Sequence, residues 1–404
     1  MEDILRLLME DIDQRWGKAG NSSEAFARVS ADALRAFAGR FDIESILTHV
    51  VEAGIGGANN SGAHVASGVV SLVSGPRYAL CLHTWLDDLV GPHSHGWNGA
   101  YQVLRGTSVQ AQYRFEESSR FDAKFRFGVL SQKSLKLLRP GDTVPVELGP
   151  RTIHGLSYVE TPGFAISVRS LEKFGELTLD YWGGVCLENE FMDDETVAKT
   201  RSLNALWAID PKLCVKTLER TLKRVDMRTG FLLLRHSASQ IADRALLERP
   251  RALYLARMGS FAPLLDRALV EIEHDANVRL RRQQTRDLEQ RLLLSLLYLA
   301  PDRKTLHRVV RALRPKREPS EFIGRCIRDM ARQPGAENRS ILGTPMGQEV
   351  EAVLGLLLED SRLETLPARV FKRYQVDNTR AQRTLMKKTA EGLRQMRLLR
   401  PVFS

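Results

Sequence analysis

The feature that most constrains the fold is a change of hydrophobic period between residues 69 and 172. Short runs in this region alternate or are rich in β-branched and aromatic residues, as in YALCLHTW, SVQAQYRF and FAISVRS. Gly, Pro and Asp separate the runs, for example at RPGD. Several short strands punctuated by turn residues are typical of an antiparallel barrel or jelly roll. The sequence therefore predicts a small β-barrel in the first half of the chain.

Helical periodicity surrounds this β-rich region. Apolar residues from Ile4 to Ile12 and from Phe26 to Phe37 follow 3.6-residue spacing. From about residue 187 onward, nearly every segment carries apolar residues at i, i+3 and i+4, and Pro or Gly residues separate the segments. No fixed repeat length relates these segments, which disfavours a solenoid.

These patterns predict an α+β protein built of three parts. They are an N-terminal helical segment and linker over residues 1–62, a β-barrel over 63–186 and a basic all-α domain over 187–404. The turn-rich stretch GIGGANNSGAHVASG is expected to be a linker or a flap over a site. A chain of 404 residues is long enough for two or three domains with sizeable cores.

Charge is unevenly distributed along the chain, whose net charge is +10. Residues 1–200 hold 19 basic and 26 acidic side chains, whereas residues 201–404 hold 40 and 23. A basic half can bind an anionic partner such as nucleic acid or a carrier protein, or can face the acidic half of its own chain. Because this half lacks interleaved aromatic residues and a recognisable helix-turn-helix, nucleic acid is a partner that the sequence permits but does not favour.

Membrane and disulfide chemistry are both disfavoured. The longest apolar runs, such as LLLSLLYLA, are far too short to span a bilayer. The acidic, amphipathic N-terminus lacks the features of a signal peptide. Four cysteines lie far apart without a CxxC pair, which argues against a disulfide framework or a thiolate zinc site. We therefore expect a cytoplasmic protein without a membrane span, and the sequence does not indicate its oligomeric state.

Residues with metal-binding chemistry lie in the β-rich region, beginning with the stretch GPHSHGWNGAYQVLRG. His93 and His95 are two residues apart, so on an extended strand their side chains share one face. His154 follows the turn PGD and a short β run, and it supplies a third imidazole. Three imidazoles with other coordination positions open can bind a transition metal and admit a substrate. The alternative is that His93 and His95 are polar loop residues without a metal.

In its motifs this region resembles the cupin superfamily. GPHSHGWNGAYQVLRG resembles the first cupin motif, with Gly99 at the position usually filled by Glu and Gly106 as the closing glycine. PGD followed by Ile and His154 resembles the second motif. Without the Glu, the site is left with three histidines. The strands RYALCLHTW and FAISVRS make the region most similar to the cysteine dioxygenase, or thiol dioxygenase, branch. The resemblance covers about a hundred residues.

Several residues of that branch are missing here. The arginine that anchors the substrate carboxylate shortly before the RYALCLHTW strand has no counterpart in AHVASGVVS. The Ser-x-His-x-Tyr pattern after the third histidine is matched by Ser167, Arg169 and Leu171, so only the serine agrees. Gly99 stands where some members have the cysteine of a Cys–Tyr cross-link. These departures argue against ordinary oxidation of free cysteine.

Four further residues are candidates for the same pocket. His83 and Trp85 share a strand face that the resemblance turns toward the metal. His83 is then a catalytic candidate, as a general acid or base or a hydrogen-bond partner of O₂, or else a core histidine. Trp85 is a substrate-binding candidate. Arg169 could bind a carboxylate or phosphate of the substrate, or could be a surface residue. Tyr101 could bring a catalytic phenol near the metal, or could be a core aromatic.

Together, these residues and the resemblance imply a non-haem metal-dependent oxygenase. Fe(II) is the expected metal, with Zn, Ni or Mn as alternatives, and O₂ is the expected co-substrate. The expected substrate is an anionic small molecule, free or tethered to a carrier or a peptide. Two other classes stay open. One is a cupin metalloenzyme that is not an oxygenase, and the other is a non-enzymatic binding or regulatory protein that uses the basic helical half.

Overall fold

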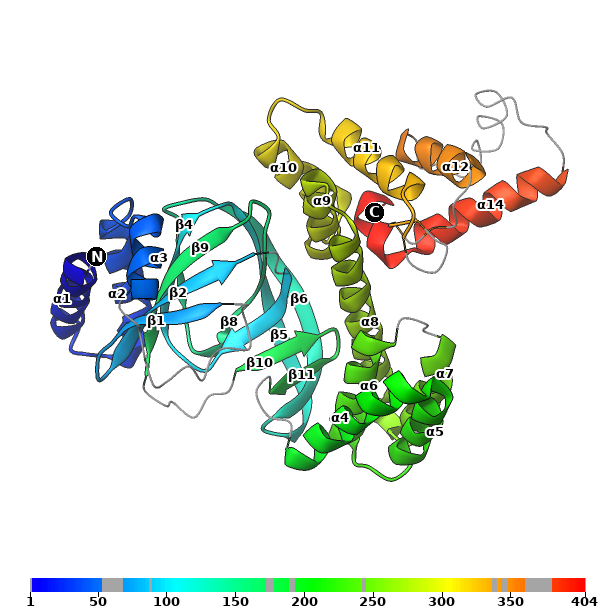
Figure 1. The fold of residues 1–404 in the computed structure, drawn as a ribbon, viewed down its shortest axis with the longest axis horizontal. Coiled ribbons are helices and arrows are strands. Elements are labelled where there is room, and N and C mark those ends of the chain that lie inside the picture. Colours follow the sequence, from blue (N-terminus) through cyan, green and yellow to red (C-terminus); the bar gives the residue numbers. More distant parts are fainter. Residues whose placement is uncertain are drawn as a thin grey trace. The chain divides into compact units, whose positions relative to one another are not determined.

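In the computed structural model the chain divides into two compact units, Met1–Glu273 and His274–Ser404 (Figure 1). The structure describes residues 2–52, 68–86, 89–171, 178–188, 193–241, 245–335, 340–342, 344, 348–359 and 380–403. The turn-rich stretch predicted to be a linker or flap lies outside the described residues, apart from Gly68.

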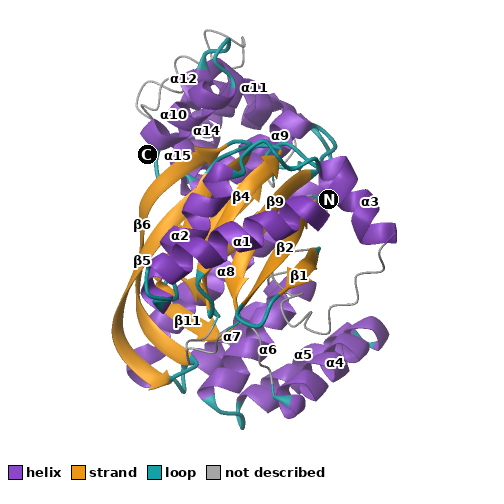
Figure 2. Cartoon of the chain, turned by 90° about the vertical axis from the view of Figure 1, so that its left-hand side faces the viewer, coloured by secondary structure: helices purple, strands orange, loops and turns teal. Residues whose placement is uncertain are grey.

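Three helices open the first unit, within the N-terminal segment predicted to be helical: α1 (Glu2–Lys18), α2 (Ser23–Ala36) and α3 (Ile43–Glu52). Helix α1 buries one face at helical spacing, through Leu5, Leu8, Ile12 and Trp16. Helices α1 and α2 lie across one face of a β-sheet (Figure 2), where their apolar residues form a common core with those of the sheet.

Eleven strands of the described chain form two connected layers of antiparallel sheet. The five-stranded sheet has the order β1 (Val69–Ser74), β2 (Tyr78–Trp85), β9 (Gly163–Ser170), β4 (Gly99–Arg105) and β7 (Thr143–Val146). The other strands close into a barrel in the order β10 (Leu179–Trp182), β11 (Val185–Glu188), β6 (Phe125–Leu138), β5 (Ser108–Asp122), β8 (Gly149–Tyr158) and β3 (Leu89–His95).

Alternation along β2 and β9 separates the outer face of the five-stranded sheet from its inner face. Leu80 and Leu82 of β2 pack in the core beneath the N-terminal helices. Trp85, of opposite parity, packs in a second core with Ala165 of β9 and with other inward-facing residues. Because side chains alternate along a strand, His83 and Arg169 also belong to the inner face.

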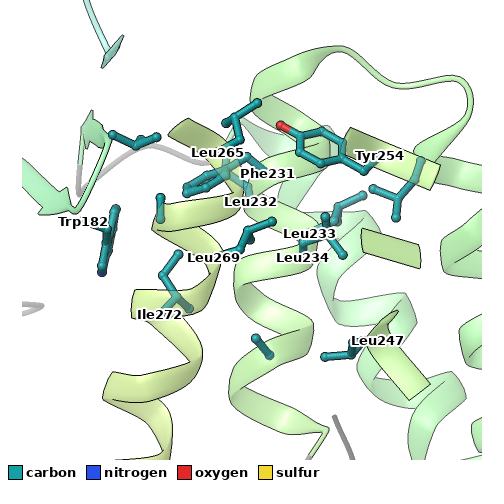
Figure 3. Close-up of a cluster of buried hydrophobic side chains, with 14 of the residues drawn as sticks. Trp182, Phe231, Leu232, Leu233, Leu234, Leu247, Tyr254, Leu265, Leu269 and Ile272 are labelled. Carbon is teal, nitrogen blue, oxygen red and sulfur yellow. The ribbon is translucent and has the colours of Figure 1, made fainter. Parts of the chain in front are cut away.

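Four helices follow the strands: α4 (Asp194–Ile209), α5 (Pro211–Leu222), α6 (Met227–Gln240) and α7 (Ala245–Leu255). With the first part of α8 (Ala262–Gln284) they share an apolar core with β6, β10 and β11. Figure 3 shows Phe231 and Leu232 in this core, with Trp182 of β10 facing them. The contacts therefore group these helices with the barrel in the first unit, and the predicted boundary at residue 187 stays a prediction.

The second unit contains the rest of α8 and the helices α9 (Leu288–Leu299), α10 (Arg303–Leu313), α11 (Pro319–Arg332), α12 (Gln348–Glu359), α14 (Arg380–Gln395) and α15 (Arg400–Phe403). The carboxylate of Glu289 makes ion pairs with Arg314, Arg317 and Arg325. Some of the positive charge of this region is therefore paired within the unit itself.

The predicted fold class is confirmed. An antiparallel barrel of the jelly-roll type follows an N-terminal helical segment and precedes a large helical region. No helix in the described part of the chain is long and apolar enough to cross a membrane. The four cysteines are buried and unpaired, and localisation in the cytoplasm stays a prediction.

Candidate metal centre

Two paired strands bring the three predicted histidines together. Strands β3 and β8 are antiparallel, with His93 directly opposite His154, and the register shifts between His93 and His95. All three side chains are at most 8% exposed. One ring nitrogen from each lies within 4.8 Å of the others. This is the only group of three or more His, Cys, Asp or Glu residues with such geometry among the residues that the structure describes.

The spacing of the ring nitrogens suits a metal ion. His95 Nε2 and His154 Nε2 lie 3.0 Å apart. Two lone pairs at this distance repel each other, so either one ring donates a proton or a cation lies between the rings. Nitrogens held about 2.1 Å from one ion are about 3.0 Å apart when they subtend a right angle. His93 Nδ1 lies 3.0 Å from the carbonyl oxygen of Gly91 and can donate to it, which leaves Nε2 free as a ligand. The donor set therefore fits a divalent transition-metal ion.

Burial keeps these imidazoles neutral. It lowers the pKa of His93 to about 4, and it lowers the pKa values of His95 and His154 well below 6.5. Repulsion from the neighbouring imidazoles adds to the lowering of pKa at His95 and His154. The neutral ring is the form that binds a metal, so the cluster is ready to accept a cation at neutral pH.

The position usually occupied by a glutamate ligand has no room for one. A Cβ atom on Gly99 would lie 1.8 Å from the carbonyl oxygen of Val168 on the neighbouring strand β9. No side chain fits at residue 99 unless this backbone moves, so the sheet itself excludes a Glu or a Cys there. Residue 99 therefore offers no side-chain ligand, and the candidate donor set is the three imidazoles.

A cationic cluster lies on the same inner face. Arg169 Nη2 donates to His83 Nε2 over 3.0 Å, and Arg169 Nε donates to Ser167 Oγ over 3.2 Å. Because a guanidinium only donates, His83 Nε2 is the acceptor and the ring proton lies on Nδ1. The guanidinium stacks 4.9 Å above Trp97, whose ring is 4.6 Å from that of His95. Trp97 thus lies against both the cation and a predicted metal ligand.

Arg169 lacks a counter-ion in the described structure. It is partly buried, yet no described carboxylate makes an ion pair with it, and burial lowers its pKa. Its charge also lowers the pKa of His83, where burial is the larger cause. A buried cation without a carboxylate is costly, and a bound anion would relieve that cost.

Aromatic rings line the rest of the inner face. His83 stacks on Trp85, with ring centroids 6.0 Å apart, and Trp85 stacks on Tyr158 at 5.5 Å. The Tyr101 ring lies 6.0 Å from that of His154, and its hydroxyl is 2.8 Å from Gln110 Nε2. Residues of the five-stranded sheet thus lie close to the histidines of β3 and β8. The roles assigned to the predicted residues stay predictions.

Sequence reasoning missed two residues of this site. Trp97 lies two residues after His95, and that spacing is a signal that could have found it. Gln110 is 1% exposed and bonds to His154 across the β5–β8 pairing. Its only local signal is an amide within the apolar part of SVQAQYRF.

No protein-family model matches the chain, and none of the curated proteins matches it. A cupin superfamily protein from Desulfitobacterium hafniense is 17% identical, over 26% of this chain and 79% of its own, with a TM-score of 0.18. Hydroquinone 1,2-dioxygenase from a Sphingomonas species, with 4-hydroxybenzoate bound, is 11% identical over 26% of this chain and 66% of its own, with a TM-score of 0.21.

A third neighbour comes from the structures of the DMSP lyases RdDddP and RnDddQII. It is 14% identical over 25% of this chain and 42% of its own, with a TM-score of 0.17. All three similarities cover about a quarter of this chain at low identity and low TM-score. The case for function therefore rests on the geometry of the site.

Proposed function

We propose that this chain is a metal-dependent oxygenase of the three-histidine, cysteine dioxygenase-like cupin type, with Fe(II) held by His93, His95 and His154. The observation that carries the proposal is a buried cluster of three neutral imidazoles beside a guanidinium that no described carboxylate neutralises. Three protein ligands leave coordination positions open for a substrate and for O₂. Bound iron would let electrons pass between these two partners.

The substrate in this proposal is an anion, either a small molecule or an acid tethered to a carrier or peptide. Arg169 Nη1 has no hydrogen-bond partner among the described residues, whereas Nε and Nη2 bond to Ser167 and His83. These two bonds fix the plane of the guanidinium, so that Nη1 can bind a carboxylate or phosphate oxygen. His83 then positions Arg169, and Trp85 and Trp97 exclude water from the anion.

The sequence has no flavin- or nicotinamide-binding motif, so in the proposed reaction the substrate itself is the electron donor. Both atoms of O₂ enter the substrate, and the substrate supplies all the electrons that O₂ takes up. Ordinary dioxygenation of free cysteine is not proposed, because the carboxylate-anchoring arginine of that branch is missing from AHVASGVVS.

Oxygen uptake by the iron-loaded protein tests the proposal. The experiment screens thiols and small organic acids and follows incorporation of both atoms of ¹⁸O₂ by mass spectrometry. With an active substrate, Arg169→Met should raise KM about 10- to 100-fold, because a charge-assisted contact is lost. The matched control is Arg105→Met, since Arg105 pairs with Glu44 at the surface.

Two results would contradict oxygenation. An iron-loaded protein that consumes no O₂ with any member of the panel would argue against it. A protein purified with Zn, Ni or Mn, and active without O₂, would favour a cupin metalloenzyme of another reaction class. Equal KM values for Arg169→Met and the parent protein would remove Arg169 from substrate binding.

A further inference from the structure

Gln110 connects a predicted metal ligand to a tyrosine in the barrel interior. Its side-chain amide lies 2.8 Å from His154 Nδ1 and 2.8 Å from the hydroxyl of Tyr101. Gln110 is 1% exposed, and Tyr101 is 9% exposed. The residues lie on three different strands, β5, β8 and β4, so folding of the barrel brings this group together.

The orientation of the amide determines which nitrogen of His154 can bind a metal. With amide Nε2 toward the imidazole, Gln110 donates to Nδ1, so the single proton of the neutral ring must lie on Nε2. Nε2 is the atom that lies 3.0 Å from His95 Nε2. A protonated Nε2 can donate to His95, but it has no lone pair for a cation.

A half-turn of the amide about its last side-chain bond reverses this situation. Amide oxygen and nitrogen exchange places with almost no change in shape. Oε1 then accepts from His154 Nδ1–H and from the Tyr101 hydroxyl, both at the same short distances. The lone pair of His154 Nε2 becomes free, beside the lone pairs of His95 and His93. Metal-bound histidines commonly donate their second ring N–H to an oxygen acceptor in this way.

We propose that Gln110 is a positioning residue that fixes the metal-binding tautomer of His154 by accepting its Nδ1–H, with the Tyr101 hydroxyl as the second donor to the same amide oxygen. The inference rests on the metal site of the proposed function and goes beyond it. In this arrangement Tyr101 acts on the metal centre through Gln110 and His154. Rotation of the Gln110 amide is the movement that converts a hydrogen-bonded histidine pair into a pair of ligands.

Two substitutions distinguish an acceptor from a donor at residue 110. Gln110→Glu supplies only acceptor oxygens, whereas Gln110→Leu supplies neither acceptor nor donor. The probe is Co²⁺ alone, titrated into the metal-free full-length protein and followed by its visible absorption. Loss of a hydrogen-bonded partner of a ligand typically weakens metal binding about 10- to 100-fold. We expect this loss for Gln110→Leu, affinity within about threefold of the parent for Gln110→Glu, and a smaller loss for Tyr101→Phe.

Gln102→Leu is the matched control, because Gln102 is equally buried in a strand but bonds to Leu34 of α2 and to Thr143, away from the histidines. It should leave both Co²⁺ affinity and absorption spectrum unchanged. Thermal unfolding of each metal-free variant separates loss of the fold from loss of affinity. Co²⁺ affinities are compared only among variants whose thermal unfolding matches that of the parent protein.

Three outcomes would overturn the inference. Gln110→Glu as weak as Gln110→Leu would show that residue 110 acts as a donor, and parent-like affinity for Gln110→Leu would show that it has no such role. A parent protein that does not bind Co²⁺ would overturn both this inference and the metal site. Co²⁺ binding that follows the expected order, without O₂ uptake by the iron-loaded parent, would support the inference and contradict only the oxygenase proposal.

Discussion

The inner face of the barrel and the helical core beside it bury very different side chains. Helices α4–α7 are packed around Phe231, Leu233 and Tyr254. In the described part of these helices, the buried polar residues are the hydroxyl residues Thr196, Thr200 and Ser237. The barrel strands instead bury imidazole and amide groups. On the inner face these are His93, His95, Gln110 and His154.

This difference separates the region that stabilises the unit from the region that we propose as the metal site. Burying a polar group costs free energy unless it is hydrogen-bonded, so a chain seldom collects several of them in one place without a use. The helical core stabilises the unit by burying apolar area. Burying imidazoles and a guanidinium on the inner face instead costs free energy of folding. Substitutions in the two regions should therefore separate stability from metal binding.

The largest effect on stability is expected from the helical core. Phe231 is fully buried, and its ring lies 5.5 Å from that of Phe125 in β6. Phe231→Ala should lower the free energy of unfolding by about 3–5 kcal/mol, through lost apolar burial and the cavity left behind. Denaturant unfolding measures this change, and metal content at low temperature should stay at the parent level. Loss of metal from a folded Phe231→Ala protein would break the separation between the two regions.

A smaller effect is expected when pH is lowered. The pKa of His93 is about 4 in the folded protein, below its ordinary value of 6.5. Between these two values the unfolded chain binds a proton that the folded chain does not, so stability falls as pH falls from about 6.5 toward 4. Each such histidine contributes up to about 1.4 kcal/mol per pH unit. Above this window the contribution is fully present.

Urea unfolding of the chelator-treated protein at pH 7, 6 and 5 measures this dependence. His93→Gln should reduce the slope of stability against pH, because it removes one imidazole whose pKa is lowered in the folded protein. A slope that is the same for the parent and His93→Gln would place the pH sensitivity elsewhere.

The smallest effect on stability is expected at the cationic cluster. Arg169→Met removes a partly buried charge that no described carboxylate neutralises, and it retains much of the apolar stem. The free energy of unfolding should change by less than about 1 kcal/mol, or rise. A clear destabilisation would show that Arg169 stabilises the barrel through its bonds to His83 and Ser167. Arg169 would then have a structural role.

Local patterns were sufficient to predict the elements and the facing of residues along single strands. Period-two alternation located β2 and β9 and placed His83 and Trp85 on one face of their strand, because the parity of a strand is fixed by its backbone. The inward direction of that face and of Arg169 came from the cupin resemblance. Helical spacing located α1 and α2 in the same way. The histidine group could be predicted because the two cupin-like motifs occur in the expected order.

Features that depend on long-range pairing could not be predicted. The lack of room at Gly99 comes from Val168, a residue of the neighbouring strand. Gln110 bonds to His154 only once β5 pairs with β8. The shared core of α4–α7 with β6, β10 and β11 depends on which apolar faces meet, and apolar periodicity alone does not specify the partner of a face.

The most direct test of the central claim is the metal content of the purified protein beside His95→Ala and His154→Ala. The parent should carry about one ion per chain, mainly iron, and each variant should carry less than about a tenth of that amount. His236→Ala is the control, because His236 bonds to Asn204 in the helical region, and it should retain the parent's metal. Full metal occupancy in both His95→Ala and His154→Ala would contradict the three-histidine centre.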